Sequence, residues 1–121
     1  MQTIYQEKKR LMMRNNLPKL VRDKIPEIIK RSGRTCEFRK ADSNEIQYVL
    51  YSKLIEENRE FFDNPSLIEA ADIYEVFLCI LQHSGFELND VIHCANLKRS
   101  ERGSFTNHLI LESMGEDQPY S

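Results

Sequence analysis

The sequence lacks the features that mark membrane-bound, secreted and disulfide-stabilised proteins. No apolar run approaches the roughly 18 residues of a membrane span, and the polar, basic start of the chain is unlike a signal peptide. The three cysteines, Cys36, Cys79 and Cys94, are widely spaced and form no CxxC motif. We therefore expect a reduced cytoplasmic protein with free thiols and no membrane partner.

Several catalytic patterns are absent as well. No Ser-His or Cys-His arrangement indicates a covalent nucleophile. The sequence has no Glu-x-x-His pair, which di-iron sites in helical bundles combine with their inward-facing carboxylates. A covalent mechanism and a di-iron centre are therefore not favoured.

Charge is unevenly distributed along the 121 residues, although the net charge is only −2. Residues 1–40 contain 12 Lys or Arg and 4 acids, whereas residues 41–121 contain 5 and 15. A basic front segment is compatible with a solvated arm or with weak nucleic-acid binding. It is also compatible with a segment that meets a polyphosphate above an acidic metal site.

Hydrophobic periodicity and end signals predict an all-α fold with at most a small two-stranded element. We expect one domain over residues 17–112, after an N-terminal extension (1–16) and before a mobile tail (113–121). Within it, the patterns predict helices at about 27–32, 42–62, 67–83 and 88–102, a short strand at 35–39 and an extended segment at 105–112. Capping-box spacings begin two of the helices, at Asp42 with Glu45 and at Ser66 with Glu69.

Two acidic motifs, EENRE (residues 56–60) and EAAD (69–72), lie on consecutive predicted helices. In the first helix Glu57 falls within the apolar stripe of Ile46, Leu50, Leu54 and Phe61. In the second, one face is predicted to hold Ile68, Asp72, Val76 and Cys79, with Glu69 beside it. Carboxylates on a core-facing stripe are costly without a partner, and a hard cation such as Mg²⁺ is a suitable one. The alternative is a solvated acidic face paired with Lys53 and Arg59.

These motifs resemble the metal-binding signature of the all-α nucleotide pyrophosphohydrolases, which include MazG-like enzymes, dimeric dUTPases and phosphoribosyl-ATP pyrophosphohydrolases. Two further segments, KLVRDKIPEII (19–29) and KRSERGSF (98–105), resemble the opening and the closing motif of a MazG-like subfamily labelled phosphoribosyl-ATP pyrophosphohydrolase-like. The resemblance covers residues 17–112. Ser104 replaces a usual glycine, the interval between Glu60 and Glu69 is short, and residues 1–16 have no counterpart.

The resemblance implies a role for each matching residue. Glu57, Glu60, Glu69 and Asp72 match ligands of Mg²⁺, for which Mn²⁺ is a possible substitute. Glu56 matches an additional acid that positions water or binds a second metal. The basic residues expected near the phosphates are Arg22, Lys24, Lys98 and Arg102. Other readings stay open: Arg22, Asp23 and Lys24 can tie the N-terminal segment to a helix, Lys98 and Arg102 suit the negative end of a helix dipole, and Glu75 is either solvated or adjacent to the site.

The implied function is Mg²⁺-dependent hydrolysis of a nucleoside triphosphate to the monophosphate and pyrophosphate, in a house-cleaning role. The alternative substrate is phosphoribosyl-ATP, in histidine biosynthesis. A hypothesis of another class is a non-catalytic helical module for oligomerisation or nucleic-acid binding; we rank nucleic acid low because all four proposed ligands are present. The resemblance also implies that a homodimer or homotetramer completes the open bundle.

Overall fold

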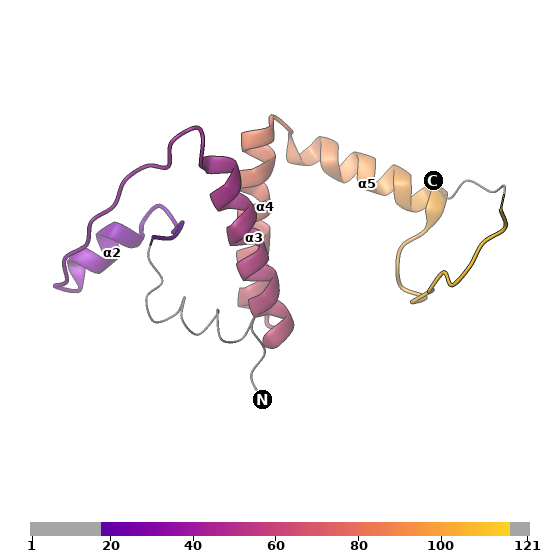
Figure 1. Ribbon diagram of the computed structural model, residues 1–121, viewed down its shortest axis with the longest axis horizontal. Helices are drawn as coiled ribbons and strands as arrows, with labels where there is room; N and C mark the ends of the chain where they lie inside the picture. Colours follow the sequence, from indigo (N-terminus) through magenta and orange to yellow (C-terminus); the bar gives the residue numbers. More distant parts are fainter. Residues whose placement is uncertain (1–17, 117–121) are drawn as a thin grey trace. The chain divides into compact units, whose positions relative to one another are not determined.

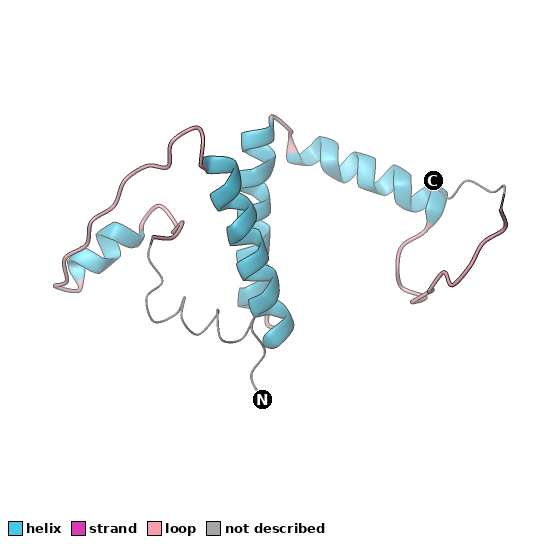
Figure 2. Ribbon diagram, viewed as in Figure 1, coloured by secondary structure: helices cyan, strands magenta, loops and turns pink. Residues whose placement is uncertain are grey.

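The computed structural model describes residues 18–116, and this part of the chain consists of helices and loops without a strand (Figures 1 and 2). The all-α fold class is therefore confirmed. The helices are α2 (Ile25–Arg31), α3 (Ile46–Asp63), α4 (Leu67–Ser84) and α5 (Leu88–Arg102). The extension predicted at residues 1–16 and the end of the tail lie outside the described residues.

End signals in the sequence lie beside several helix boundaries, although α3 begins at Ile46 and not at the predicted Asp42, because residues 43–45 form a turn. Asp42 and Glu45 form a reciprocal capping box, in which each side chain accepts a hydrogen bond from the other residue's backbone N–H, at 3.0 and 3.1 Å. The Glu69 backbone N–H donates to the Ser66 hydroxyl oxygen at 3.1 Å, which caps the start of α4. Gly103 follows α5 with a φ of 83°, a left-handed conformation that glycine adopts without strain.

The short strand predicted at residues 35–39 is wrong, because this segment is a loop. A strand needs a neighbouring strand to satisfy its backbone groups, and the described residues offer none. Local contacts hold the loop instead. Lys30 lies 5.1 Å from the centre of the Phe38 ring, and Arg39 forms an ion pair with Glu45. That ion pair lowers the pKa of the Glu45 carboxyl, first through its hydrogen bond from Arg39.

α3 and α4 pack side by side as a helical hairpin, joined by residues 64–66 (Figure 1). Asn64 and Pro65 interrupt the helix, and a connection this short returns the chain antiparallel to itself. The hairpin core is small. Among the described residues, Leu50 and Leu81 are the apolar side chains that become buried, at 3% and 8% exposure. The third buried residue is Glu57, at 6%.

The inward face of α4 differs from the one predicted. Ile68 is 75% exposed and Cys79 is also exposed, so neither belongs to the packed face. The other two members of the predicted face, Asp72 and Val76, are partly covered, as is Ile73 beside them. The prediction is therefore right in the middle of the face and wrong at its two ends.

The chain separates into two compact units, Met1–Ser84 and Gly85–Ser121. The first contains α2 and the α3–α4 hairpin. The second contains α5 and the segment after it, where the Ser104 and Thr106 hydroxyls are 3.1 Å apart and the Thr106 backbone N–H donates to the Ser104 hydroxyl oxygen at 3.4 Å. The extended segment predicted at residues 105–112 is wrong at its start, where the His108 backbone N–H donates to the Phe105 carbonyl oxygen at 3.2 Å and closes a turn.

Candidate metal centre

The α3–α4 hairpin brings the two acidic motifs together. Glu57 and Glu60 lie near the end of α3, and Glu69 and Asp72 lie near the start of α4. In an antiparallel hairpin with a short connection, residues at similar distances from the turn face each other. The three-residue connection around Pro65 therefore places the two motifs opposite one another. The start of α4 also favours carboxylates, because the positive end of its helix dipole lies there.

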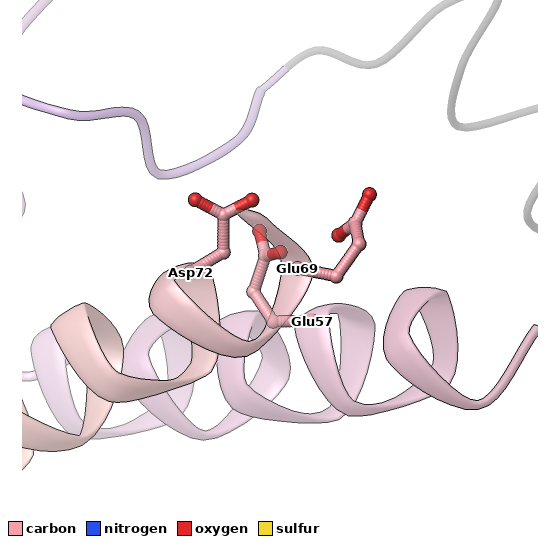
Figure 3. A group of neighbouring side chains, drawn as sticks. All are labelled: Glu57, Glu69 and Asp72. Carbon is pink, nitrogen blue, oxygen red and sulfur yellow. The ribbon is translucent and has the colours of Figure 1, made fainter. Parts of the chain in front are cut away.

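Three of the four predicted ligands converge. One carboxylate oxygen from each of Glu57, Glu69 and Asp72 lies within 4.8 Å of the other two. Figure 3 shows the three side chains extending to the same side of the hairpin. Glu69 and Asp72 are partly buried and Glu57 is almost fully buried. This burial distinguishes the group from a solvated acidic face, in which the charges are screened and can separate.

Two of the carboxylate oxygens in this group lack partners. Oε2 of Glu57 and Oε2 of Glu69 are buried and receive no hydrogen bond from the part of the chain that the structure describes. A buried carboxylate oxygen without a donor costs free energy unless a proton or a cation is supplied. The arrangement therefore fits a cation that several oxygens approach at once.

Glu60 responds to the same excess of negative charge. Its pKa is raised from 4.5 to about 7, first because burial disfavours its charged form and next because of the negative charge of Glu57. A hydrogen bond with Glu57, which Glu60 can donate only when protonated, raises the pKa further, as do the charges of Glu56 and Glu69. A proton on Glu60 and a cation in the group are thus two ways to relieve the same repulsion.

Lys53 supplies positive charge on the α3 side of the site. Its Nζ lies 3.2 Å from Oε2 of Glu56 and 3.4 Å from Oε1 of Glu57. The sequence interpretation placed Lys53 only in the alternative of a solvated face, yet its side chain is 17% exposed. The spacing of Lys53 to Glu56 and Glu57, three and four residues, is the signal that predicts this contact.

Arg22 supplies positive charge on the α4 side. Its Nη2 donates to Oδ1 of Asp72 at 2.7 Å, so this side chain ties the segment before α2 to the acidic group. The pairing agrees with the tethering alternative, and it also places one of the predicted phosphate-binding residues at the site. Lys24 stands at the N-terminal boundary of α2, with an exposed side chain.

The other predicted phosphate-binding residues, Lys98 and Arg102, belong to the second unit. Both are exposed, and Arg102 lies in the last turn of α5. The position of Arg102 suits the negative end of the helix dipole, as the alternative interpretation holds, whereas Lys98 lies before the last turn. Their approach to the acidic group stays a prediction. Glu75, one turn beyond Asp72, is exposed, which agrees with the solvated reading of that residue.

The donor set consists entirely of carboxylate oxygens. Hard divalent cations such as Mg²⁺, Mn²⁺ and Ca²⁺ prefer such ligands, whereas zinc and copper sites favour nitrogen and sulfur. Two of these oxygens, Oε2 of Glu57 and Oε2 of Glu69, are buried and receive no hydrogen bond from the described residues. The residues present can therefore hold a hard cation.

Comparison of the chain with models of known protein families, with curated proteins and with solved structures found no match. The resemblance to MazG-like enzymes therefore depends on the motifs themselves. No helix in the described part of the chain is long and apolar enough to span a bilayer.

Proposed function

We propose that this chain is a Mg²⁺-dependent nucleotide pyrophosphohydrolase of the MazG-like type. It would cleave the α–β phosphoanhydride of a nucleoside triphosphate and release the monophosphate and pyrophosphate. The observation that carries the proposal is the approach of Glu57, Glu69 and Asp72 to within 4.8 Å, with buried oxygens that lack donors. The motif order supports it, because basic residues flank the acids on both sides in the sequence.

A nucleotide is the substrate class that matches these charges. Its phosphates are strongly anionic and arrive with a divalent cation, which neutralises phosphate oxygens and makes water a better nucleophile. Isolated carboxylates would repel such a substrate, whereas carboxylates holding a cation attract it. Arg22 already lies at the site through Asp72, and it would turn toward phosphate when the substrate binds. Lys24, Lys98 and Arg102 would offset charge on the leaving pyrophosphate.

The five acids of the two motifs would have two roles: four would bind the cation, and one would accept a proton from water. Glu57, Glu60, Glu69 and Asp72 would hold Mg²⁺ or, in its place, Mn²⁺. Glu56 pairs with Lys53 through Oε2, which leaves Oε1 to accept a hydrogen bond from the attacking water. An ionised carboxylate in this position orients the water and accepts its proton. Direct attack by water needs no covalent intermediate.

A nucleotide panel with a pyrophosphate-specific readout tests the proposal. Canonical, deoxy and modified triphosphates and phosphoribosyl-ATP are each incubated with the full chain, with Mg²⁺ or with EDTA. We expect pyrophosphate from at least one substrate with Mg²⁺ and none with EDTA. Preference for phosphoribosyl-ATP would place the reaction in histidine biosynthesis. Orthophosphate as the product, or no product from any substrate, would refute the assignment.

We also propose that the working form is a homodimer or homotetramer in the cytoplasm. Large apolar side chains of the hairpin are exposed, including Phe62 at 81%, Leu67 at 87% and Ile68 at 75%. A second copy presents the same side chains and would cover them. Cys36, Cys79 and Cys94 are free, which suits a reducing compartment.

A further inference from the structure

Lys53 is a cation of α3 that contacts the acidic motif directly, and its side chain is largely covered. Its side chain is 17% exposed, as is that of Glu56, and that of Glu57 is 8% exposed. The pair between Arg31 and Glu27 on α2 is 75% and 57% exposed, a typical surface arrangement. Lysine is rarely withdrawn from water unless its charge is needed where it lies.

The ammonium group joins two carboxylates as a metal ion would. It lies 3.2 Å from Glu56 and 3.4 Å from Glu57, because residues three and four positions apart share one side of a helix. In enzymes with two metal ions, the ions lie about 3.5–4 Å apart, a spacing that one shared carboxylate can bridge. Glu57 has the arrangement of such a bridge: Oε1 contacts Lys53, and the carboxylate also belongs to the group with Glu69 and Asp72.

We infer that Lys53 is a built-in cation that fills the place of a second metal ion, so that the free chain binds one divalent cation per acidic site. This inference rests on the metal site of the proposed function and specifies its stoichiometry. Lys53 also fixes the orientation of Glu57, whose Oε2 is buried and receives no hydrogen bond from the described residues. Because Lys53 holds Glu56 by one oxygen, Glu56 stays available to orient water. Any further divalent cation in the reaction arrives with the nucleotide.

Charge balance supports this assignment. The two motifs contain five carboxylates, and Lys53 and Arg22 form direct ion pairs with three of them. One divalent cation added to Lys53 and Arg22 reduces the charge of these groups from −5 to −1. A second one would have to displace Lys53, whose ammonium would lose both of its partners in a poorly solvated position.

Titration with Mn²⁺ in the absence of nucleotide, followed by electron paramagnetic resonance, tests the inference. The full-length parent should bind one Mn²⁺ per chain, with the spectrum of an isolated ion. Lys53→Met, which removes the charge and keeps a similar length, should bind two, and their signals should broaden through coupling across Glu57. Lys53→Arg is the matched control and should bind one. Circular dichroism establishes that each variant is folded.

The outcomes separate this inference from the proposed function. Two coupled Mn²⁺ ions in the parent would refute the role of Lys53, and this measurement needs no variant. A single Mn²⁺ in folded Lys53→Met would refute it as well, while pyrophosphate release by the parent would leave the proposed function standing. A parent that binds no Mn²⁺ would overturn both.

Discussion

At the scale of single residues, the hydrophobic periodicity of the sequence identified Glu57, the carboxylate on which the interpretation as a metal site depends. Glu57 falls within an apolar stripe of the sequence, and it is the acid that the structure buries. The contact between Arg22 and Asp72 joins residues that are 50 positions apart, and no local pattern predicts a contact at that separation. Lys53 was identifiable by its spacing, but its burial depends on the packing of α3 against α4, which the sequence does not reveal.

The raised pKa of Glu60 predicts how the stability of the metal-free protein changes with pH. Below about pH 4.5, Glu60 is protonated in both the folded and the unfolded protein, so it does not reduce the free energy of unfolding. Above about pH 7, Glu60 is ionised in both, and the folded protein must hold this charge close to other carboxylates. The contribution of this residue to stability should therefore fall as pH rises from about 4.5 to 7. Glu60→Gln removes the dependence, so its melting temperature in EDTA should exceed that of the parent increasingly over this range.

Glu75→Gln is the control for that measurement, because Glu75 is an exposed acid on the adjacent helix. Its pH profile should follow that of the parent. Parallel profiles for Glu60→Gln and the parent would show that Glu60 ionises normally in the folded chain.

Two substitutions that remove one charge each should have opposite effects in EDTA. Oε2 of Glu69 is buried without a hydrogen bond from the described residues, so Glu69→Gln removes repulsion and should raise the melting temperature. Asp72 pairs with Arg22, so Asp72→Asn leaves that cation without its partner and should lower it. Both should abolish turnover and the stabilisation by Mg²⁺, which arises because a ligand of the native state shifts the folding equilibrium.

Differential scanning fluorimetry with EDTA and with millimolar Mg²⁺ measures both effects, and Glu75→Gln should respond as the parent does. If Asp72→Asn retains normal turnover and a normal response to Mg²⁺, Asp72 is no ligand. A rise for Asp72→Asn in EDTA would instead mean that Arg22 contributes nothing there.

At the scale of elements, end signals next to a helix predicted its boundary well in some places and less well in others. α4 begins at the predicted Leu67, directly after the Ser66 cap, and α5 ends at the predicted Arg102, directly before Gly103. The helix predicted from Asp42 begins four residues later, at Ile46, because the capping-box residues form a turn before it. The strand at 35–39 failed for a different reason, since a strand depends on a partner that local sequence does not specify. The predicted face of α4 was inaccurate because apolar residues surround this helix on several sides.

The cap of α4 also supports the site, because Ser66 receives a hydrogen bond from the backbone of Glu69, one of the proposed ligands. Ser66→Ala should lower stability by about 1 kcal/mol, the usual cost of losing a helix cap, which corresponds to a few degrees in melting temperature. It should also weaken Mg²⁺ binding, because the first turn of α4 positions Glu69. Ser66→Thr preserves the hydroxyl and should behave as the parent. Chemical denaturation with and without Mg²⁺ distinguishes the two variants, and equal stability would mean that the cap is dispensable.

At the scale of the whole molecule, the hairpin buries little apolar surface to stabilise it on its own. Helices in proteins derive most of their stability from packing, and Leu50 and Leu81 are the only buried apolar residues in the described part of the chain. The exposed Phe62, Leu67 and Ile68 cluster around the α3–α4 connection in sequence. This pattern is typical of a surface that a partner covers.

Leu67→Glu tests whether a second copy of the chain covers this surface. In a monomer, replacement of a side chain that is 87% exposed should leave stability nearly unchanged. In an oligomer the new carboxylate would be buried at the interface, so the chain should dissociate and its melting temperature should fall. Sedimentation velocity over a hundredfold range of concentration reports the assembly state, and we expect a dimer or tetramer for the parent and a smaller species for the variant.

Gln82→Glu is the control, because it adds the same charge at an exposed polar position of α4, and this variant should remain assembled. A parent that sediments as a monomer at every concentration would remove the second copy as the partner, and a variant that assembles as well as the parent would place the interface elsewhere.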